Sequence, residues 1–385
     1  MGKDLEHKDR ENGRMQQYDI AIVGGGLAGL AFGIRAQQLG YKTCILEKRQ
    51  VRRHKVCGEY LSLESLPFLE SLGVELTTLG LPIVAKLDVY TTDRQRAIGH
   101  NIELPLGGIG ISRLMLDGLL ADAYEARGGA LVENEAVKQV QARASDYCLT
   151  TTSQTIAASL VVDASGKYPN LGGERKAKTY MGIKYHVGNA GLDREAITLV
   201  HFRGGYCGTS AIEDGRRCVC YLVTKHEFDR HGSLEAFTKN VLMKNDMLGA
   251  LLAPENQLWE RPLVISNFYF EAPAGPSELP SIGDAQRLIP PLSGNGMSLA
   301  LAAASTLAKC LEATEHSQLF ADRTGLMEDY NARWKQRFGS RFRTGIGIQT
   351  ITEHRLAIPL LRFAFGWKPL AKAIIGGTHG APFTS

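Results

Sequence analysis

The sequence predicts an α/β fold in which a doubly wound, Rossmann-like domain carries an inserted β-rich layer and a helical C-terminal region. Three observations predict it. A glycine-rich turn joins an apolar strand to a helix near the N-terminus, and a second glycine-rich segment precedes an alanine-rich helix near residue 296. Between them, from about residue 180 to 270, the chain consists mainly of short β-like segments.

The composition is that of a globular protein long enough to bury a large core, with 385 residues, 44% apolar and 22% charged. The net charge of +4 is spread along the chain without a long basic block, so nucleic-acid binding is not expected. The seven cysteines include no C-x-x-C pair, and their spacing indicates neither a metal site nor a disulfide framework. The N-terminus is charged and lacks an apolar signal core, which favours a cytoplasmic protein. The oligomeric state stays open.

We expect one nucleotide-binding domain that the β-rich layer interrupts. Its last strand is then supplied late in the chain. The expected parts are a disordered lead (1–17), the first part of the nucleotide-binding domain (18–178), a β-rich substrate domain (179–275), the last part of the nucleotide-binding domain (276–315) and a helical C-terminal region (316–385).

The stretch YDIAIVGGGLAG begins a β-α-β unit. Its apolar run ends at Val23, the helical periodicity that follows stops at Gly40, and KTCILEK predicts a second strand that ends at Glu47. Farther along, residues 112–129 predict an amphipathic helix, and LVVDASG predicts a buried strand that leads into a turn.

The turn in this unit has the spacing of a dinucleotide-binding fingerprint. Gly24 permits a tight turn, Gly26 lets the backbone approach a pyrophosphate, and Gly29 lets the helix pack closely on the strand. The helix N-terminus offers N–H groups to the phosphates, and Glu47 is placed to bind a ribose. This motif alone leaves NAD and FAD open.

The second glycine-rich segment, GDAQRLIPPLSGNGMSLAL, favours FAD. Gly283 and Asp284 follow an apolar strand, so the aspartate can bind ribityl hydroxyls. Pro291, Gly294 and Gly296 belong to a loop that opens a helix, and its N-terminus can face the pyrimidine edge of a flavin, where negative charge accumulates on reduction.

Together GGGLAG…E and GDA…PPLSGNGMSLAL resemble the FAD-binding fold shared by flavin hydroxylases of the p-hydroxybenzoate hydroxylase type, geranylgeranyl reductases and flavin halogenases. The resemblance covers roughly residues 18 to 310. It implies that Arg113 contacts FAD and that Asp163 and Gly166 lie near the adenosine half. It is specific for FAD and less so for the reaction.

The resemblance implies three alternative reactions. Halogenases of the tryptophan type carry a GWxWxIP signature, and none of the three tryptophans here stands in such a motif. Geranylgeranyl reductases resemble the chain at Cys57-Gly58, which would lie beside the flavin, but their substrate-domain signature is not intact around Tyr206. Flavin hydroxylases need mainly a dry pocket that places the substrate over the ring. Their DG signature is replaced here by DASG, which leaves the electron donor open.

The β-rich layer supplies the candidate pocket residues. We prefer His201 and Tyr206 as polar pocket residues and Cys57 as a residue at the flavin edge, and these three are the candidate catalytic residues. Strand alternation turns some of the other candidates toward the flavin and the rest away from it. Those others are Tyr185, His186, Tyr269 and Phe270. Cys218 and Cys220 would share one strand face, where packing is favoured over redox work.

The tail, HRLAIPLLRFAFGWKPLAKAIIGG, is apolar but interrupted by prolines and cations, so it does not span a bilayer. It can act as a lid over an apolar pocket or contact a membrane surface, and either role implies a lipophilic substrate.

We expect an FAD-dependent oxidoreductase, with NAD(P)H-dependent hydroxylation of a hydrophobic aromatic or polyketide-like metabolite as the first hypothesis. NADH or NADPH is the expected electron donor. The alternatives are reduction of isoprenoid double bonds and a non-catalytic, flavin-bound protein that interacts with a partner.

Overall fold

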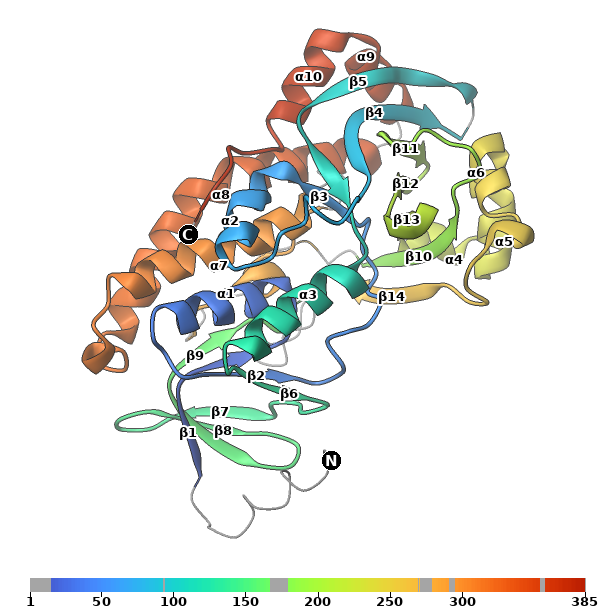
Figure 1. Cartoon of the computed structure of the whole chain (residues 1–385). Coiled ribbons are helices and arrows are strands. Elements are labelled where there is room, and N and C mark those ends of the chain that lie inside the picture. The colour runs from blue at the N-terminus through green and yellow to red at the C-terminus, as the bar shows by residue number, and fades with distance from the viewer. Residues whose placement is uncertain are drawn as a thin grey trace.

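The computed structural model describes residues 15–92, 94–166, 179–268, 270, 279–290, 295–353 and 357–384. Within these residues the strands form two sheets, one of six and one of eight strands, which lie one above the other in Figure 1. The first strand begins at Gln16, so the last two residues of the expected lead are part of a strand. The rest of that lead, up to residue 14, lies outside the described residues.

The six-stranded sheet is the predicted nucleotide-binding sheet. Its strand order is β6-β2-β1-β9-β8-β7, in which the first four strands are parallel and the last two antiparallel. Their bounds are β1 Gln16–Val23, β2 Thr43–Glu47, β6 Ala130–Glu133, β7 Gln139–Ala142, β8 Tyr147–Thr150 and β9 Thr155–Asp163. The predicted β-α-β unit is confirmed, with α1 spanning Leu27–Gln38 between β1 and β2.

Three helices cover one face of this sheet: α1, α3 (Arg113–Ala126) and α7 (Gly296–Glu312). Alternate residues of β1, such as Ile20 and Ile22, point into the core that these helices share. The amphipathic helix expected over 112–129 is α3, and Ser112 caps it by accepting a hydrogen bond from the Met115 N–H. Both the fold class and its principal elements are therefore as predicted.

The eight-stranded sheet has the order β14-β10-β13-β12-β11-β4-β5-β3. Its bounds are β3 Tyr60–Ser62, β4 Ile83–Thr91, β5 Arg94–Gly110, β10 Tyr180–Gly188, β11 Ala196–Phe202, β12 Gly205–Ala211, β13 Arg216–Thr224 and β14 Leu263–Phe268. Three of these strands come from residues 60–110, inside the range expected for the nucleotide-binding domain. The predicted division at residue 179 is therefore incorrect for this segment, because β4 pairs in parallel with β11 across more than a hundred residues of sequence.

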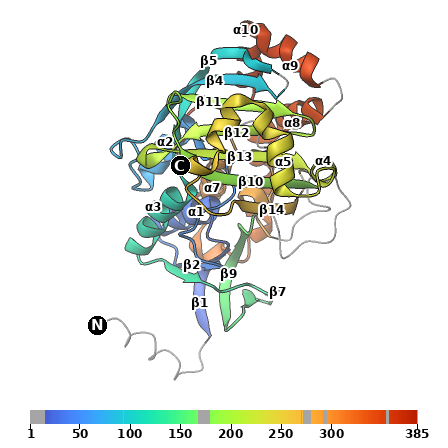
Figure 2. The same cartoon turned by 90° about the vertical axis from the view of Figure 1, so that its right-hand side faces the viewer.

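The two faces of the eight-stranded sheet differ. Three short helices that the sequence analysis did not predict, α4 (Lys225–Asp229), α5 (Leu234–Asn240) and α6 (Asp246–Leu251), lie over one face, as Figure 2 shows. The side chains of Ile183, Tyr185, Val219 and Val200 belong to the core on that side. The turn at Asp214-Gly215 joins β12 to β13 as a hairpin, and both residues have positive φ.

The C-terminal region is helical, as predicted. Helix α8 (Arg323–Glu353) is long, and α9 (Ala357–Gly366) and α10 (Lys368–Gly376) pack on β5 at the end of the molecule away from the six-stranded sheet (Figure 1). The short α2 is Leu66–Ser71. Among the described residues, no helix has both the length and the apolar composition needed to cross a bilayer.

The late strand expected before Gly283 is reduced to a single parallel bridge between Asp163 and Ser281. Two backbone hydrogen bonds hold it, from the Asp163 N–H to the Pro280 carbonyl and from the Ile282 N–H to the Asp163 carbonyl. The chain therefore does return to the end of β9, as expected, and within the described residues 279–290 it adds one paired position to the sheet.

Candidate functional site

The glycine turn between β1 and α1 is built by two close contacts. Gly24 has φ of +112°, and a Cβ there would meet the Ala164 carbonyl oxygen at 2.4 Å. A Cβ on Gly29 would meet the Gly24 carbonyl oxygen at 2.1 Å. Side chains are therefore excluded at both positions, one by the backbone that follows β9 and one by the turn itself.

Gly26 is different, because a Cβ there would meet no atom within 4 Å among the residues that the structure describes. The same holds for Gly58 and Gly166. Gly26 precedes the first turn of α1, whose N–H groups are available to an anion. Space beside these glycines, with a helix N-terminus next to it, fits the pyrophosphate group of a dinucleotide.

Glu47 ends β2 and is buried. Its carboxylate accepts hydrogen bonds from the Gly25 N–H at 2.9 Å and the Arg49 N–H at 3.1 Å. Glu47 thus stabilises the glycine turn, and it also lies where the sequence predicts a residue that binds the ribose.

The second glycine-rich segment meets the first at the same edge of the sheet. Gly283 begins a short 3-10 helix that includes Asp284, and its φ of +64° permits a tight turn. A Cβ on Gly283 would lie 3.0 Å from Cβ of Ala28 in α1, so the two segments are in contact. Gly296 is the first residue of α7, whereas Pro291 and Gly294 lie outside the described residues.

Asp163 is buried at the end of β9, where its carboxylate accepts a hydrogen bond from the Ser165 N–H at 2.9 Å. The carboxyl ends of β1 and β9, the start of α1 and the 3-10 helix at Gly283 therefore meet at one place. This is the edge at which open α/β sheets bind their ligands.

Arg113, the expected FAD contact on α3, is not a surface residue, since its side chain is only 15% exposed. Its guanidinium makes two hydrogen bonds of 2.9 Å to the buried carboxylate of Asp117, which also pairs with the ammonium of Lys55 at 2.6 Å. Burial opposes the charge of Arg113, but Asp117 and the neighbouring Asp284 carboxylate raise its pKa above the ordinary value. Arg113 and Asp284 thus share one electrostatic environment although they are far apart in sequence.

The loop Lys55–Glu59 contains the predicted Cys57-Gly58 element. Hydrogen bonds from the eight-stranded sheet hold this loop in place. Three of its carbonyl oxygens accept hydrogen bonds from side chains of that sheet. The pairs are Lys184 Nζ with the Lys55 carbonyl (3.0 Å), Cys218 Sγ with the Cys57 carbonyl (3.4 Å) and Ser210 Oγ with the Gly58 carbonyl (3.2 Å). The loop is therefore fixed by residues of three different strands.

Glu59 lies at the centre of this arrangement and is fully buried. Its Oε1 accepts hydrogen bonds from the Lys184 ammonium and from the Arg113 backbone N–H (2.8 Å), and its Oε2 lies 2.6 Å from Nε2 of His186. The ring of His186 stacks on Trp259, with 4.3 Å between centroids. We call Glu59, Lys184 and His186 the buried triad.

The charges of the buried triad support one another. Burial alone would raise the pKa of Glu59, but the His186 hydrogen bond and the Lys184 charge lower it below the ordinary value. Burial alone would lower the pKa of Lys184, yet that pKa is raised, and Glu59 supplies the charge responsible. Cys218 adds no charge at neutral pH, because burial raises its own pKa well above the usual range.

His54 lies beside the triad, with its ring 4.9 Å from that of His186. Its pKa is lowered, chiefly by burial and then by the neighbouring His186 and Lys184. Ligand atoms of His54, Glu59 and His186 lie within 4.8 Å of one another. However, the ammonium of Lys184 already pairs with the Glu59 carboxylate. The positive charge of Lys184 beside this cluster disfavours the binding of a metal cation.

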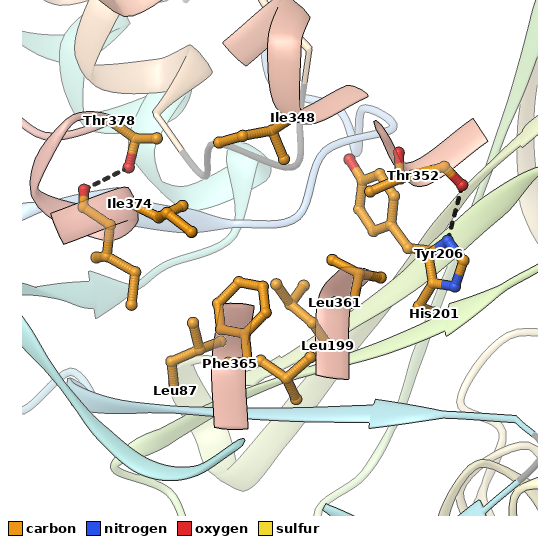
Figure 3. Close-up of a pocket in the computed structure, with 12 residues that line it drawn as sticks. Leu87, Leu199, His201, Tyr206, Ile348, Thr352, Leu361, Phe365, Ile374 and Thr378 are labelled. Carbon is orange, nitrogen blue, oxygen red and sulfur yellow. Dashed lines mark hydrogen bonds between the residues drawn. The ribbon is translucent and has the colours of Figure 1, made fainter. Parts of the chain in front are cut away.

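A cavity separates the eight-stranded sheet from the C-terminal helices, and two of the predicted residues line it. His201 and Tyr206 face each other across β11 and β12, and both are buried. The other lining residues are almost all apolar, for example Leu87, Leu199, Leu361, Phe365 and Ile374 (Figure 3). At about 60 Å³ the cavity is smaller than the roughly 150 Å³ that holds a benzene ring. A substrate ring therefore requires the lining side chains to move.

His201 and Tyr206, the polar residues that the sheet contributes to the cavity wall, differ in their hydrogen bonds. Nε2 of His201 donates a hydrogen bond to the Thr352 carbonyl in α8 at 2.9 Å, as Figure 3 shows. The Tyr206 hydroxyl is buried and has no hydrogen-bond partner among the residues that the structure describes. Burial raises its pKa well above the ordinary value, so it remains a neutral donor.

The C-terminal segment links this cavity to the flavin edge predicted from the sequence. The Thr378 carbonyl, at the cavity wall, accepts a hydrogen bond from Asn295, which precedes α7. The Tyr60 hydroxyl lies 3.3 Å from Nε2 of His379. The buried Glu64 accepts hydrogen bonds from Arg341 and from the Gly380 N–H. The tail therefore fastens directly onto the segment that follows Glu59.

The sequence predicts Cys57, His201 and Tyr206 as one set of catalytic candidates, but Cys57 does not line the cavity that the other two line. Cys57 is on the loop above the triad and is half-buried, whereas His201 and Tyr206 lie on the cavity wall. Lys184 was not predicted as a site residue. A lysine inside the apolar strand segment MGIKYHV was the signal that was available, because its i+2 neighbour His186 shares its strand face. Tyr185 points to the opposite face, and Tyr269 lies outside the described residues.

Comparison with known proteins agrees with this geometry. Residues 19–58 match the family model of an FAD binding domain. The digeranylgeranylglycerophospholipid reductase of Methanococcus vannielii is 21% identical over 374 residues, which covers 88% of this chain and 87% of that protein.

Two solved structures illustrate the similarity in fold. The flavin-dependent brominase Bmp2 has a TM-score of 0.74 at 16% identity, with 94% of each chain covered. PqsL of Pseudomonas aeruginosa, described as a probable FAD-dependent monooxygenase, has a TM-score of 0.66 at 17% identity, covering 94% of this chain and all of that one. The predicted fold and the predicted cofactor FAD are thereby confirmed, while the reactions named for these proteins differ from one another.

Proposed function

We propose that this protein is an FAD-dependent monooxygenase that hydroxylates a hydrophobic aromatic or polyketide-like substrate held in the cavity beside His201 and Tyr206. Reduced flavin supplies the activation of O₂, and NADH or NADPH is the proposed electron donor. The remaining work falls to the protein, which must bind the substrate, orient it and keep water out.

The observation that carries the proposal is the Tyr206 hydroxyl. A buried hydroxyl without a partner costs free energy, and a ligand that accepts its hydrogen bond removes that cost. The surrounding wall is apolar. A ligand suited to both features has an apolar body and one oxygen acceptor, such as a phenol or a ketone.

The other residues have positioning roles in this proposal. The Arg113–Asp117 pair and the buried triad hold the loop of Cys57 and the start of α3 in place. We assign Cys57, on the loop that these residues hold, to the flavin edge and not to proton transfer.

Reduction of isoprenoid double bonds is the second candidate. It is favoured by the named activity of the Methanococcus relative and by the aliphatic lining of the cavity. An isoprenoid chain offers no acceptor to the Tyr206 hydroxyl, which is why we place this candidate second.

The test is to reduce the flavin-loaded protein without oxygen, to admit O₂ in the presence of aromatic candidates, and to measure flavin reoxidation and product together. The monooxygenase proposal predicts product in proportion to the flavin oxidised. Peroxide alone with every aromatic candidate, together with electron transfer to prenyl lipids, contradicts it. A yellow protein that does not oxidise NAD(P)H and does not react with O₂ after reduction supports the non-catalytic alternative.

A matched pair of variants tests whether an effect on product formation is specific to the Tyr206 hydroxyl or follows from the loss of any buried tyrosine hydroxyl. Tyr206→Phe should lower the fraction of reoxidation that yields product by about tenfold, since one buried hydrogen bond contributes roughly 1–1.5 kcal/mol. Tyr221→Phe, whose ring is buried on the opposite face of the same sheet, should leave that fraction unchanged. FAD content should be equal in both variants.

A further inference from the structure

Helix α9 and the turn that follows it present an apolar stripe to solvent. Leu360, Phe363 and Trp367 are 43%, 69% and 58% exposed. They are spaced at i, i+3 and i+7, which places them on one side of the helix. Phe363 and Trp367 are the two most exposed large apolar residues among those that the structure describes.

The opposite side of the same helices lines the cavity. Leu361 and Phe365 of α9 and Ile374 of α10 point inward (Figure 3). Close packing on the sheet fixes this orientation, because a Cβ on Gly99 in β5 would lie 3.1 Å from the Phe365 carbonyl oxygen. Both sides of α9 are therefore apolar, one facing the cavity and the other facing solvent.

The charged side chains of the segment that carries the stripe have one sign. From residue 354 to the C-terminus the chain contains no aspartate or glutamate. Lys368 and Lys372 are exposed beside the stripe, and Lys372 pairs with Glu103 of β5. Exposed leucine, phenylalanine and tryptophan flanked by lysines is the composition of a segment that lies in the interface of an anionic membrane. Tryptophan in particular favours the level of the headgroups.

We propose that the outer side of α9 and α10 docks on a lipid bilayer that carries anionic headgroups. The helices are too short to cross the bilayer and lie along its surface, with Phe363 and Trp367 inserted. The same contact gives a hydrophobic substrate a direct route from the bilayer to the cavity, because one pair of helices separates the two. This consequence rests on the proposed function.

The test measures binding to vesicles, without turnover. The flavin-loaded full chain is floated with vesicles of phosphatidylcholine alone and of phosphatidylcholine with phosphatidylglycerol. We expect flotation with the anionic vesicles, weaker flotation with neutral ones, and a loss as salt is raised. The double variant Phe363→Ser/Trp367→Ser should bind at least about tenfold less.

A matched control uses exposed apolar residues at the other edge of the sheet. Leu258 and Val264 are 50% and 47% exposed, near and in β14, and Leu258→Ser/Val264→Ser should float like the wild type. Trp367 also reports directly, since its emission should shift to shorter wavelength on adding anionic vesicles, and Trp367→Phe should abolish the shift.

Three results overturn the proposal. The wild type does not float with anionic vesicles, or both double variants float equally well, or sedimentation equilibrium shows a dimer that Phe363→Ser/Trp367→Ser converts to monomer while no vesicle binding occurs. The last result assigns the stripe to a second copy of the chain. Vesicle binding without hydroxylation would contradict the proposed function and leave the docking surface intact, so the two failures are distinguishable.

Discussion

Glu59 shows how much of the site depends on single buried charges. A carboxylate, an ammonium and an imidazole are all buried within hydrogen-bonding distance, and Glu59 also has a positive φ of 56°, which is unfavourable for a residue with a side chain. Buried ion pairs seldom stabilise a protein relative to apolar packing. The arrangement instead fixes the position of the Cys57-Gly58 loop and of the first residue of α3.

Replacing Glu59 by Gln should therefore destabilise the protein strongly. The substitution leaves the Lys184 ammonium buried without its counter-charge, and the expected loss in the free energy of unfolding is about 3–5 kcal/mol. Denaturant titration measures it. Adding Lys184→Met to Glu59→Gln should recover part of the loss, because the uncompensated charge is then removed.

The control for this prediction is Glu195→Gln. Glu195 pairs with Lys86 at 3.2 Å but is 62% exposed, so its loss should cost about 0.5 kcal/mol or less. A Glu59→Gln variant no less stable than Glu195→Gln would show that the buried triad contributes nothing to stability.

At the scale of elements, the β1–α1 turn assigns different tasks to glycines that look alike in the sequence. Gly24 and Gly29 are glycines because the protein's own backbone fills the space beside them. In the described part of the chain Gly26 has no such neighbour within 4 Å, and its φ of −88° is one that any residue adopts. Its small size is needed only if a ligand approaches.

Two alanine variants test this division. Gly29→Ala should prevent stable folding or lower the melting temperature severely, because its Cβ would overlap the Gly24 carbonyl oxygen. Gly26→Ala should fold like the wild type but retain less FAD, with about a tenfold or greater increase in the dissociation constant. Flavin absorbance and thermal unfolding of the FAD-free protein measure the two effects separately. Normal FAD content in Gly26→Ala would remove the assignment of this turn to the pyrophosphate.

At the scale of the whole molecule, the C-terminal tail joins parts that the chain order keeps far apart. It covers the cavity with α9 and α10, reaches the start of α7 through Thr378, and contacts Tyr60 through His379. A change at the tail should therefore be felt at the predicted flavin edge as well as at the cavity.

Stability should fall when the pH drops from about 7.5 to 5.5. His54 and His379 both have pKa values below the ordinary value of about 6.5, mainly because they are buried. Below pH 6.5 these two histidines bind protons in the unfolded chain but not in the folded chain. The free energy of unfolding therefore falls with pH until the pH reaches the lowered pKa values of the folded state. The contribution of Glu59, whose pKa is lowered from about 4.5, is present above that value and is lost only at lower pH.

Urea unfolding of His54→Gln/His379→Gln at the two pH values checks this prediction. The double variant should lose less stability between them than the wild type, whereas His226→Gln, at an exposed imidazole, should follow the wild type. Equal losses in the double variant and the wild type would show that other groups govern the acid sensitivity.

The β-α-β unit, the glycine turn with Glu47 and the preference for FAD could all be predicted from the amino-acid sequence. These depend on local periodicity and on backbone requirements of single glycines, which a sequence displays directly. The sequence also predicts His201 and Tyr206 as pocket residues, and both line the cavity, while their part in a reaction stays a prediction.

The contacts between residues that are distant in sequence could not be predicted in this way. The assignment of residues 60–110 to the substrate sheet follows from the pairing of β4 with β11, which no local pattern encodes. The buried triad joins Glu59 to strand β10, and the cavity forms only when α9 and α10 fold over the sheet. Long-range strand pairing and side-chain burial set these contacts, and both depend on the packed molecule as a whole.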